Sequence, residues 1–411
     1  MTVVSAVGAH GPDAIHQPVA STRQWLPGLE VLRGVAAVTV VFHHLWSLGT
    51  MPRFFGSWII EGFGSWGVDI FFVLSSYLLI GQFLEPASRP RLRSYFVRRV
   101  FRIVPAYYAS IVILFLFLAP HAQLFSAGGV RQLLGNLTFA FWWFPTLSSS
   151  LNVNGVYWTL SLEMCLYLAI PLVGFFLRRR PLLVGGALIA AGLGWKLVCA
   201  RYPGAIRGWF FDGPAPPEGI VRIFMSRQFP GVLAVFAVGF LTRWLVERHP
   251  EVRGPFAWTN RHPIVAVVVL LAPTIVWLRT IETGLDFQHW RWFVVWDFVL
   301  ALLAVPAIIG LSSITLTDRP GPMLRLGEWF GARSYGIYLW HFPIVLTVYG
   351  RGAEMLPPDT SSPHLKAALV LALAIGFGTA SYHLIEVPAQ EVGKRLATRA
   401  RDQRRNRPAA P

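Results

Sequence analysis

Charged residues are scarce in this chain, and their scarcity limits the fold. They make up 14% of the 411 residues, whereas a soluble domain carries about a quarter. With so little charge the surface cannot be covered by groups that water solvates, which excludes a soluble enzyme. The hydrophobic fraction of 54% also excludes a disordered chain. Cys165 and Cys199 are the only cysteines, and both lie in apolar stretches, so a disulfide scaffold is excluded and both are interpreted as packing residues.

Several common catalytic patterns are absent as well. The sequence has no glycine-rich phosphate loop, no nucleophile elbow and no His/Cys spacing typical of a metal site. We therefore predict that the protein binds no metal and no resident cofactor. No internal repeat suggests the inverted halves of a transporter.

Apolar residues are instead concentrated in blocks, each about as long as a helix that crosses a bilayer. The blocks predict an all-α, polytopic membrane protein with ten transmembrane helices. The predicted spans are residues 31–50, 67–84, 103–119, 157–177, 182–200, 229–246, 263–281, 292–311, 334–350 and 366–386.

The net charge of +16 is explained by orientation in the membrane. If the N-terminus is cytoplasmic, roughly two thirds of the Lys and Arg residues fall in cytoplasmic segments, as the positive-inside rule requires. An even number of spans places both termini on that side. We therefore predict no nucleic-acid partner. The predicted domain organisation is a cytoplasmic segment at 1–29 without a cleaved signal, a transmembrane domain at 30–388 and a basic cytoplasmic tail at 389–411. The long aromatic loops 120–156 and 201–228 then lie outside.

Ionisable residues inside the spans are candidates for function, because they are costly at membrane depth. The first span contains Arg33, His43 and His44. Arg33 and His44 are eleven residues apart, so they share a helix face about 16 Å apart along the axis, whereas His43 points elsewhere. The alternative is that both histidines lie at the membrane interface and Arg33 only reaches the headgroups.

Two acidic residues lie in other spans. Asp69 follows Gly67 in the second span, and Glu163 lies in the fourth, with Tyr167 on the same face. A carboxylate at this depth can orient a histidine, pair with an arginine or bind a polar group of a substrate. The alternative for each is a structural hydrogen bond between helices.

The cytoplasmic segment before the third span is denser in arginine than orientation requires. Its arginines are Arg89, Arg91, Arg93, Arg98, Arg99 and Arg102. Arg99 and Arg102 fall on one helix face and could bind a phosphate with planar guanidinium groups. Binding of anionic lipid, or topology alone, is the alternative.

Taken together, the ordered motifs resemble the acyltransferase 3 family of membrane O-acyltransferases. The segments that carry the resemblance are Leu32–His44, Gly67–Ser75, Arg98–Pro105, Trp158–Pro171, Ser334–Pro343 and Tyr382–Pro388. Two positions depart from the common pattern: Ser76 stands where glycine is usual, and Met164 where many members have a second glutamate. The second departure leaves Glu163 as the sole acid there.

The resemblance implies a ten-helix membrane domain that moves an acyl group, often acetyl, from cytoplasmic acyl-CoA to a hydroxyl. It implies a catalytic role for His44, with Arg33 as its paired arginine and Glu163 as an orienting or acceptor-binding acid. It also implies acyl-CoA binding by Arg99 and Arg102, with Arg98 beside them. Substrate-binding or structural roles are expected for Asp69, Trp158, Ser161, Tyr167, Tyr338 and His341.

The expected partners are acyl-CoA as co-substrate, membrane lipids and an acceptor sugar, glycolipid or antibiotic. The residue usage is typical of a high-GC bacterium, so we expect the bacterial plasma membrane and an acceptor in the cell envelope. Acyl transfer could be direct or pass through an acyl-enzyme on His44. A transporter or flippase for a lipid or glycoconjugate is the alternative class, and a receptor or scaffold a third; dependence on a thioester donor distinguishes the enzyme from both.

Overall fold

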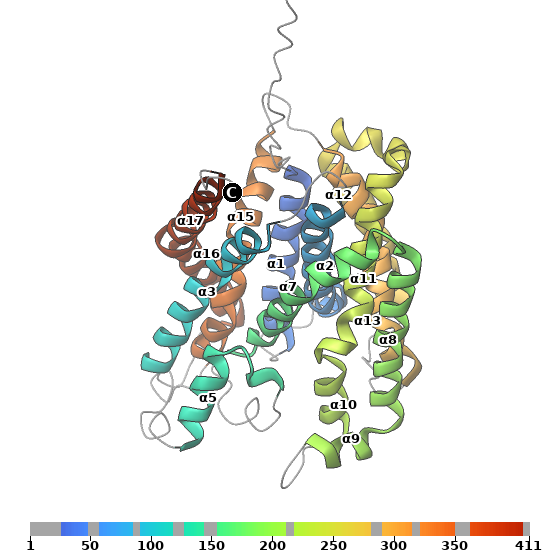
Figure 1. Cartoon of the computed structure of the whole chain (residues 1–411). Helices are drawn as coiled ribbons and strands as arrows, with labels where there is room; N and C mark the ends of the chain where they lie inside the picture. The colour runs from blue at the N-terminus through green and yellow to red at the C-terminus, as the bar shows by residue number, and fades with distance from the viewer. Residues whose placement is uncertain are drawn as a thin grey trace, which may run out of the picture.

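The computed structural model describes nine stretches of the chain, which Figure 1 draws as coloured ribbons. These stretches are residues 26–47, 57–84, 91–117, 127–143, 154–210, 218–280, 290–314, 321–349 and 362–405. Within them the regular structure is helical throughout and includes no strand. The predicted all-α fold is confirmed.

Helices of 8 to 28 residues form the body of the molecule. They are α1 (Pro27–Ser47), α2 (Ser57–Leu84), α3 (Leu92–Phe117), α7 (Tyr157–Leu177), α8 (Pro181–Arg201), α11 (Phe229–Arg248), α12 (Pro263–Thr280), α13 (Trp290–Leu303), α14 (Val305–Ser312), α15 (Pro322–Val348), α16 (Pro363–Ser381) and α17 (Val387–Arg405). A proline in the first turn opens several of them, because it has the helical φ angle already and its missing N–H would be unpaired there anyway.

The chain is a multi-pass membrane protein. Among the described residues, eight helical segments are long and apolar enough to cross a membrane. The two remaining predicted spans are helical too: α12 has a shorter apolar stretch, and α15 carries Arg325, Glu328 and Arg333 in its first half. The count of ten spans and the side of each terminus remain predictions.

Three helices begin well before the predicted spans. α2, α3 and α15 start at Ser57, Leu92 and Pro322, whereas the apolar blocks begin at 67, 103 and 334. Hydropathy detects only the part of a helix at membrane depth, and a helix continues wherever its backbone hydrogen bonds do. The predicted acyl-CoA-binding arginines consequently lie on α3 itself.

Shorter helices lie at the ends of the bundle. The predicted outer loops contain α5 (Ala127–Leu137), η1 (Phe141–Trp143), α9 (Pro203–Phe210) and α10 (Glu218–Ser226). Figure 1 shows α5, α9 and α10 at the lower end and α17 at the upper end. The upper end also holds η2 (Pro250–Asn260), whose Thr259 Oγ1 donates a hydrogen bond to the Gly310 carbonyl oxygen at 3.0 Å. The predicted boundary at residue 388 falls inside a helical run, because α16 passes through the π-helix η3 (Tyr382–Glu386) into α17.

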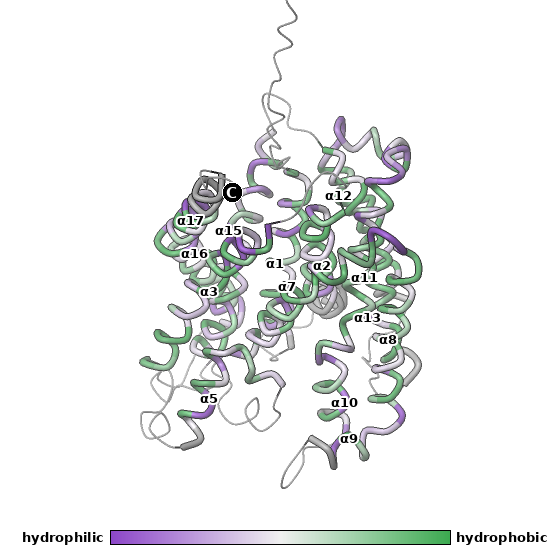
Figure 2. Tube along the Cα trace, in the orientation of Figure 1, coloured by the Kyte–Doolittle hydropathy of each residue, from purple (hydrophilic) through white to green (hydrophobic). Residues whose placement is uncertain are grey.

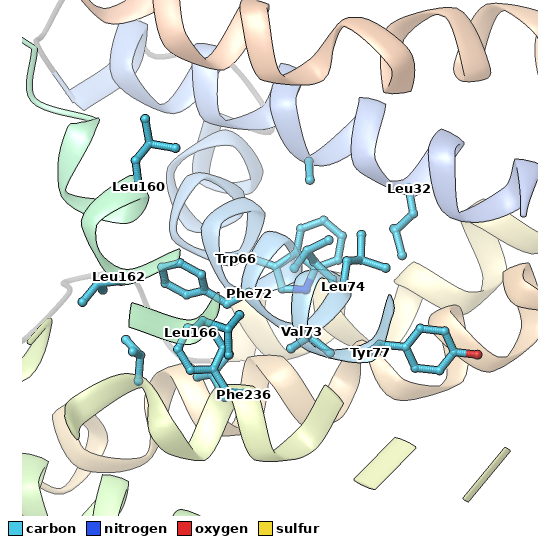
Figure 3. Close-up of a cluster of buried hydrophobic side chains, with 14 of the residues drawn as sticks. Leu32, Trp66, Phe72, Val73, Leu74, Tyr77, Leu160, Leu162, Leu166 and Phe236 are labelled. Carbon is cyan, nitrogen blue, oxygen red and sulfur yellow. The ribbon is translucent and has the colours of Figure 1, made fainter. Parts of the chain in front are cut away.

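The apolar core is centred on α2. Figure 3 shows side chains of α2, including Phe72, packed with Leu162 of α7 and Phe236 of α11. Other large apolar side chains face outward, such as Leu182 of α8, which is 70% exposed. Outward apolar surface suits contact with lipid tails, and Figure 2 shows hydrophobic colour along the lengths of the helices.

Candidate active site

A close contact between α1 and α15 positions the histidine pair. A Cβ atom on Gly34 would lie 2.9 Å from the Gly331 backbone nitrogen, so the two helices approach backbone to backbone. Ten residues further along each helix, His44 and His341 meet. Equal spacing from both glycines means that the helices run parallel and in register for about 15 Å. Small residues permit such close packing at membrane depth.

The two histidines form a hydrogen-bonded relay with defined tautomers. His341 Nδ1 lies 2.7 Å from the Tyr338 carbonyl oxygen, and His44 Nδ1 lies 3.1 Å from the Val40 carbonyl oxygen. Because a carbonyl oxygen only accepts, both Nδ1 atoms carry the proton. His341 Nε2, 3.0 Å from His44 Nδ1, then accepts from it. His44 Nε2 is thereby left as the basic nitrogen of a neutral imidazole.

The beginning of α7 holds α15 in place beside this relay. Thr159 Oγ1 is 2.9 Å from the Tyr338 hydroxyl oxygen, and Asn154 Nδ2 donates to the Leu339 carbonyl oxygen at 2.8 Å. His341 is fully buried, and the Phe342 ring packs edge-on against His44 with centroids 5.0 Å apart. The imidazole of His44 is thus held by protein atoms on several sides.

Glu163 belongs to a second cluster, on the inner side of α7. Its Oε1 accepts hydrogen bonds from Tyr167 at 2.6 Å and from Ser75 at 3.2 Å. The Arg99 guanidinium lies 5.9 Å from the centre of the Tyr167 ring. Glu163 interacts electrostatically with Arg102 and with Tyr338, so it lies between the arginines of α3 and the histidine relay. Its hydrogen-bond partners are not the histidines, which are oriented by each other.

The predicted arginines divide into two groups. Arg99 is buried at 7% exposure and Arg102 is half-buried, whereas Arg98 is exposed and donates to the Ser94 carbonyl oxygen of its own helix. Arg33 pairs with Glu30 at 3.0 Å in the first turns of α1. Arg99 and Arg102 are therefore the arginines of α3 that face the helix bundle.

Glu386 was missed as a site residue by the sequence analysis. It lies at the end of the π-helix η3, is 3% exposed, and accepts a hydrogen bond from Ser381 at 3.0 Å. It interacts electrostatically with Arg102 and Arg33. Single π-turns inside α-helices are frequent at functional sites. The segment around it carried the family resemblance, but periodicity gave no sign that the carboxylate faces arginines.

A third polar cluster lies toward the end of the bundle that holds α9 and α10. Asp69 is 5% exposed and interacts electrostatically with Lys196, Asp297 and Arg227. Lys196 of α8 forms an ion pair with Asp297 of α13. The Arg227 guanidinium lies 5.2 Å from the Trp158 ring centre. The last three charged residues were not predicted as site residues, although each lies in or beside an apolar block, which was the available signal.

Ser161 is the remaining predicted residue of α7. It is buried, and its hydroxyl oxygen has no hydrogen-bond partner within the described part of the chain. Those described residues also contain no group of three or more His, Cys, Asp or Glu side chains that could hold a metal ion. The chemistry that this arrangement can support is therefore proton transfer at a neutral imidazole, flanked by an arginine cluster and a cluster of mixed charge.

Comparisons with known proteins identify the family that the chain matches. Residues 26–383 match the acyltransferase 3 family, described as an acyltransferase domain. The chain is 28% identical over 404 residues to the peptidoglycan O-acetyltransferase OatA of Listeria monocytogenes; the match covers 90% of this chain and 57% of that protein, so the chain spans little more than half of it. It is 26% identical over 341 residues to nodulation protein 10 of Rhizobium leguminosarum, covering 79% of this chain and 84% of the relative. No solved structure matches.

Proposed function

The chain belongs to the acyltransferase 3 family and is an acyltransferase, and we propose that it transfers an acetyl group from cytoplasmic acyl-CoA to a hydroxyl of a cell-envelope carbohydrate or glycolipid. The relative named as a peptidoglycan O-acetyltransferase supports acetyl as the transferred group and a carbohydrate hydroxyl as the acceptor. The bacterial plasma membrane is the corresponding location.

The observation that carries the proposal is the tautomer of His44. With its Nδ1 proton shared between Val40 and His341, its Nε2 lone pair can accept the proton of an acceptor hydroxyl. The hydroxyl oxygen then attacks the thioester carbonyl carbon, because an alkoxide-like oxygen is a far better nucleophile than an alcohol. Collapse of the tetrahedral intermediate breaks the C–S bond, and the proton passes from Nε2 to the departing CoA sulfur.

Arg99 and Arg102 bind the phosphates of the donor in this proposal. CoA carries several negative charges, and guanidinium groups suit phosphates through paired, planar hydrogen bonds. Arg33 and Glu386 interact electrostatically at the same end of the bundle, so a carboxyl group partly offsets the positive charge there. The rise from Arg33 to His44 is about 16 Å, a distance that the extended pantetheine arm of CoA spans.

Glu163 lines the route between the two ends. It is anchored by Tyr167 and Ser75, and it interacts with both Arg102 and Tyr338. We assign it to positioning the thioester arm or the acceptor near His44. Direct transfer requires no covalent acyl-enzyme, because the base and both substrates meet at one imidazole.

Substitution of the two neighbouring histidines tests the function. Purified protein in lipid nanodiscs is given acetyl-CoA and a panel of alcohols, and free CoA thiol is measured. His44→Ala should lower the acceptor-dependent rate at least about a hundredfold, the low end for loss of a general base. His43→Ala is the comparison variant: its ring packs edge-on against His44 with centroids 5.4 Å apart, but the contacts that set the His44 tautomer are made with Val40 and His341, so its effect should be much smaller. Near-normal CoA release by folded His44→Ala protein, or substrate movement without any acyl-CoA, contradicts the proposal.

A further inference from the structure

Lys196 carries a charge into a helix that packs against α11 on one face and exposes apolar side chains on the other. It is 3% exposed and pairs with Asp297, whereas Leu182 and Leu183 of the same helix are 70% and 64% exposed. Lys196 is buried and the Asp297 side chain is 23% exposed. Desolvation of such a partly buried ion pair offsets much of its attraction, so apolar residues of similar volume would serve stability about as well. Ionisable groups at membrane depth mark substrate paths or binding sites more often than structural supports.

Asp69 adds an unsatisfied acceptor to this ion pair. Its Oδ2 is buried and has no hydrogen-bond partner within the stretches that the structure describes. A buried carboxylate oxygen without a donor is costly, and native proteins rarely keep one without a reason. Asp69 interacts electrostatically with both Lys196 and Asp297, so the three side chains form one unit. A hydroxyl group supplied by a ligand would satisfy the orphaned oxygen.

Arg227 connects this unit to the catalytic histidine. It interacts electrostatically with Asp69 and with His44. Its guanidinium lies over Trp158, and its backbone oxygen accepts a hydrogen bond from Trp142 Nε1 at 3.0 Å. These contacts hold the junction between α10 and α11 against α7 and η1. Arg227 therefore lies within electrostatic range of both Asp69 and the His44 imidazole.

The position of the unit along the bundle is opposite to the donor arginines. Lys196 lies near the end of α8 that leads into α9, and Arg227 lies between α10 and α11. Figure 1 shows α9 and α10 together at one end of the bundle, away from α17. Arg99 and Arg102 lie near the beginning of α3, which packs against α17 where Gly393 meets Phe101. Donor and acceptor would thus reach His44 from opposite ends.

The unit contains as many acidic as basic side chains, which indicates the kind of ligand. Asp69 and Asp297 bring two carboxyl groups, and Lys196 and Arg227 bring two cationic side chains. An anionic group would meet the carboxylates, whereas a hydroxyl both donates and accepts and suits all four. We propose that Asp69, Lys196, Arg227 and Asp297 form the acceptor-binding site and that it takes a neutral, hydroxyl-rich group such as a sugar ring. This inference rests on the proposed function, since it assigns the acceptor side of the same reaction.

Removing Lys196 and Asp297 together tests the site without changing the balance of acidic and basic side chains in the unit. The Lys196→Met/Asp297→Leu double variant should fold, because neither partner is stranded. Release of free CoA from acetyl-CoA is measured in nanodiscs with trehalose and chitotetraose as neutral acceptors and glucose 6-phosphate as the anionic one. We expect an unchanged KM for acetyl-CoA and at least a tenfold higher KM for the better neutral sugar. An unchanged sugar KM, or a preference of the wild-type protein for the phosphorylated sugar, overturns the proposal.

A charge reversal separates binding from structural support. The Lys196→Asp/Asp297→Lys variant restores an ion pair between the same helices. If the pair only joins α8 to α13, the reversal restores the wild-type sugar KM, which counts against the proposal. If the pair binds the acceptor, thermal stability recovers while the sugar KM stays high.

Binding without turnover distinguishes failure of this inference from failure of the proposed function. Stabilisation of the protein against thermal unfolding is measured with each sugar in the absence of acetyl-CoA. Neutral sugars should stabilise the wild-type protein and not the Lys196→Met/Asp297→Leu variant, whether or not CoA is later released. Absence of such stabilisation in the wild type overturns the proposed site. Sugar binding to a protein that releases no CoA from acetyl-CoA, whichever alcohol is present, overturns the proposed transfer alone.

Discussion

His341 donates its Nδ1 proton to the Tyr338 carbonyl oxygen, so only its Nε2 can accept from His44. Its proposed role is to hold the tautomer of His44 in which Nδ1 carries the proton and Nε2 is the basic nitrogen. We predict that His341→Phe lowers the acyl-transfer rate at least about tenfold, a smaller loss than that of the base itself. The KM for acyl-CoA should stay unchanged, because the donor phosphates bind elsewhere. His341→Gln is the control: its amide oxygen can accept from His44 and should restore part of the rate. Equal rates in all three proteins would contradict this role.

The arginines of α3 differ in burial, and their contributions should differ accordingly. Arg99→Lys and Arg102→Lys should each raise the KM for acyl-CoA about tenfold or more, because an ammonium group cannot make the paired contacts of a guanidinium, and a lost charged contact contributes about 1.4 kcal/mol or above. Arg93→Lys, exposed on the same helix, is the matched control and should leave KM unaltered. A correctly inserted Arg99→Lys/Arg102→Lys protein with wild-type KM would show that this pair only sets topology.

At the scale of helices, the parallel contact between α1 and α15 aligns His44 with His341. A side chain at Gly331 would overlap the carbonyl oxygen of Glu30. We predict that Gly331→Val destabilises the protein by about 1–3 kcal/mol, as overpacking does, and shifts His44 relative to His341, so that the turnover rate falls. Thermal unfolding in detergent and the transfer rate measure both effects. Gly376→Ala is the control, because a Cβ there has no atom within 4 Å; a similar loss in both variants would argue against a specific contact.

Hydropathy predicted the helices well and their ends poorly. Within the described residues, each of the ten apolar blocks corresponds to helix, because an apolar stretch at membrane depth has no other way to satisfy its backbone. The extension of α3 back to Leu92 was missed, because its first turns are polar and carry arginines.

The site was predicted in its residue types more than in its pairings. His44, Glu163 and Arg99 stood out as ionisable residues in or beside apolar blocks. The contact of His44 with His341 and the ion pair of Lys196 with Asp297 depend on which helices are neighbours. Periodicity along one helix carries no information about its neighbour, so these pairs required the tertiary structure.

At the scale of the whole molecule, the charges differ between the two ends of the bundle. The arginines of α3 lie near one end, where α3 packs against the arginine-rich helix α17. The unit of Asp69, Lys196, Asp297 and Arg227 is balanced and lies toward the other. An end rich in arginine suits the CoA phosphates, and an end with equal numbers of acidic and basic side chains suits a neutral acceptor. If the donor is cytoplasmic acyl-CoA, as proposed, this asymmetry requires that the arginine end face the cytoplasm.

Orientation can therefore be measured directly with reporter fusions. A reporter that is active only outside the cytoplasm should be inactive when fused after residue 90 or after Arg405, and active when fused after residue 214, between α9 and α10. The physical reason is the positive-inside rule, since about two thirds of the Lys and Arg residues lie in the segments assigned to the cytoplasm. A cytoplasm-active reporter at the same three positions is the control and should give the opposite pattern. Activity of the first reporter after residue 90 would place Arg99 and Arg102 away from cytoplasmic acyl-CoA, and would contradict both the topology and the direction of transfer that depends on it.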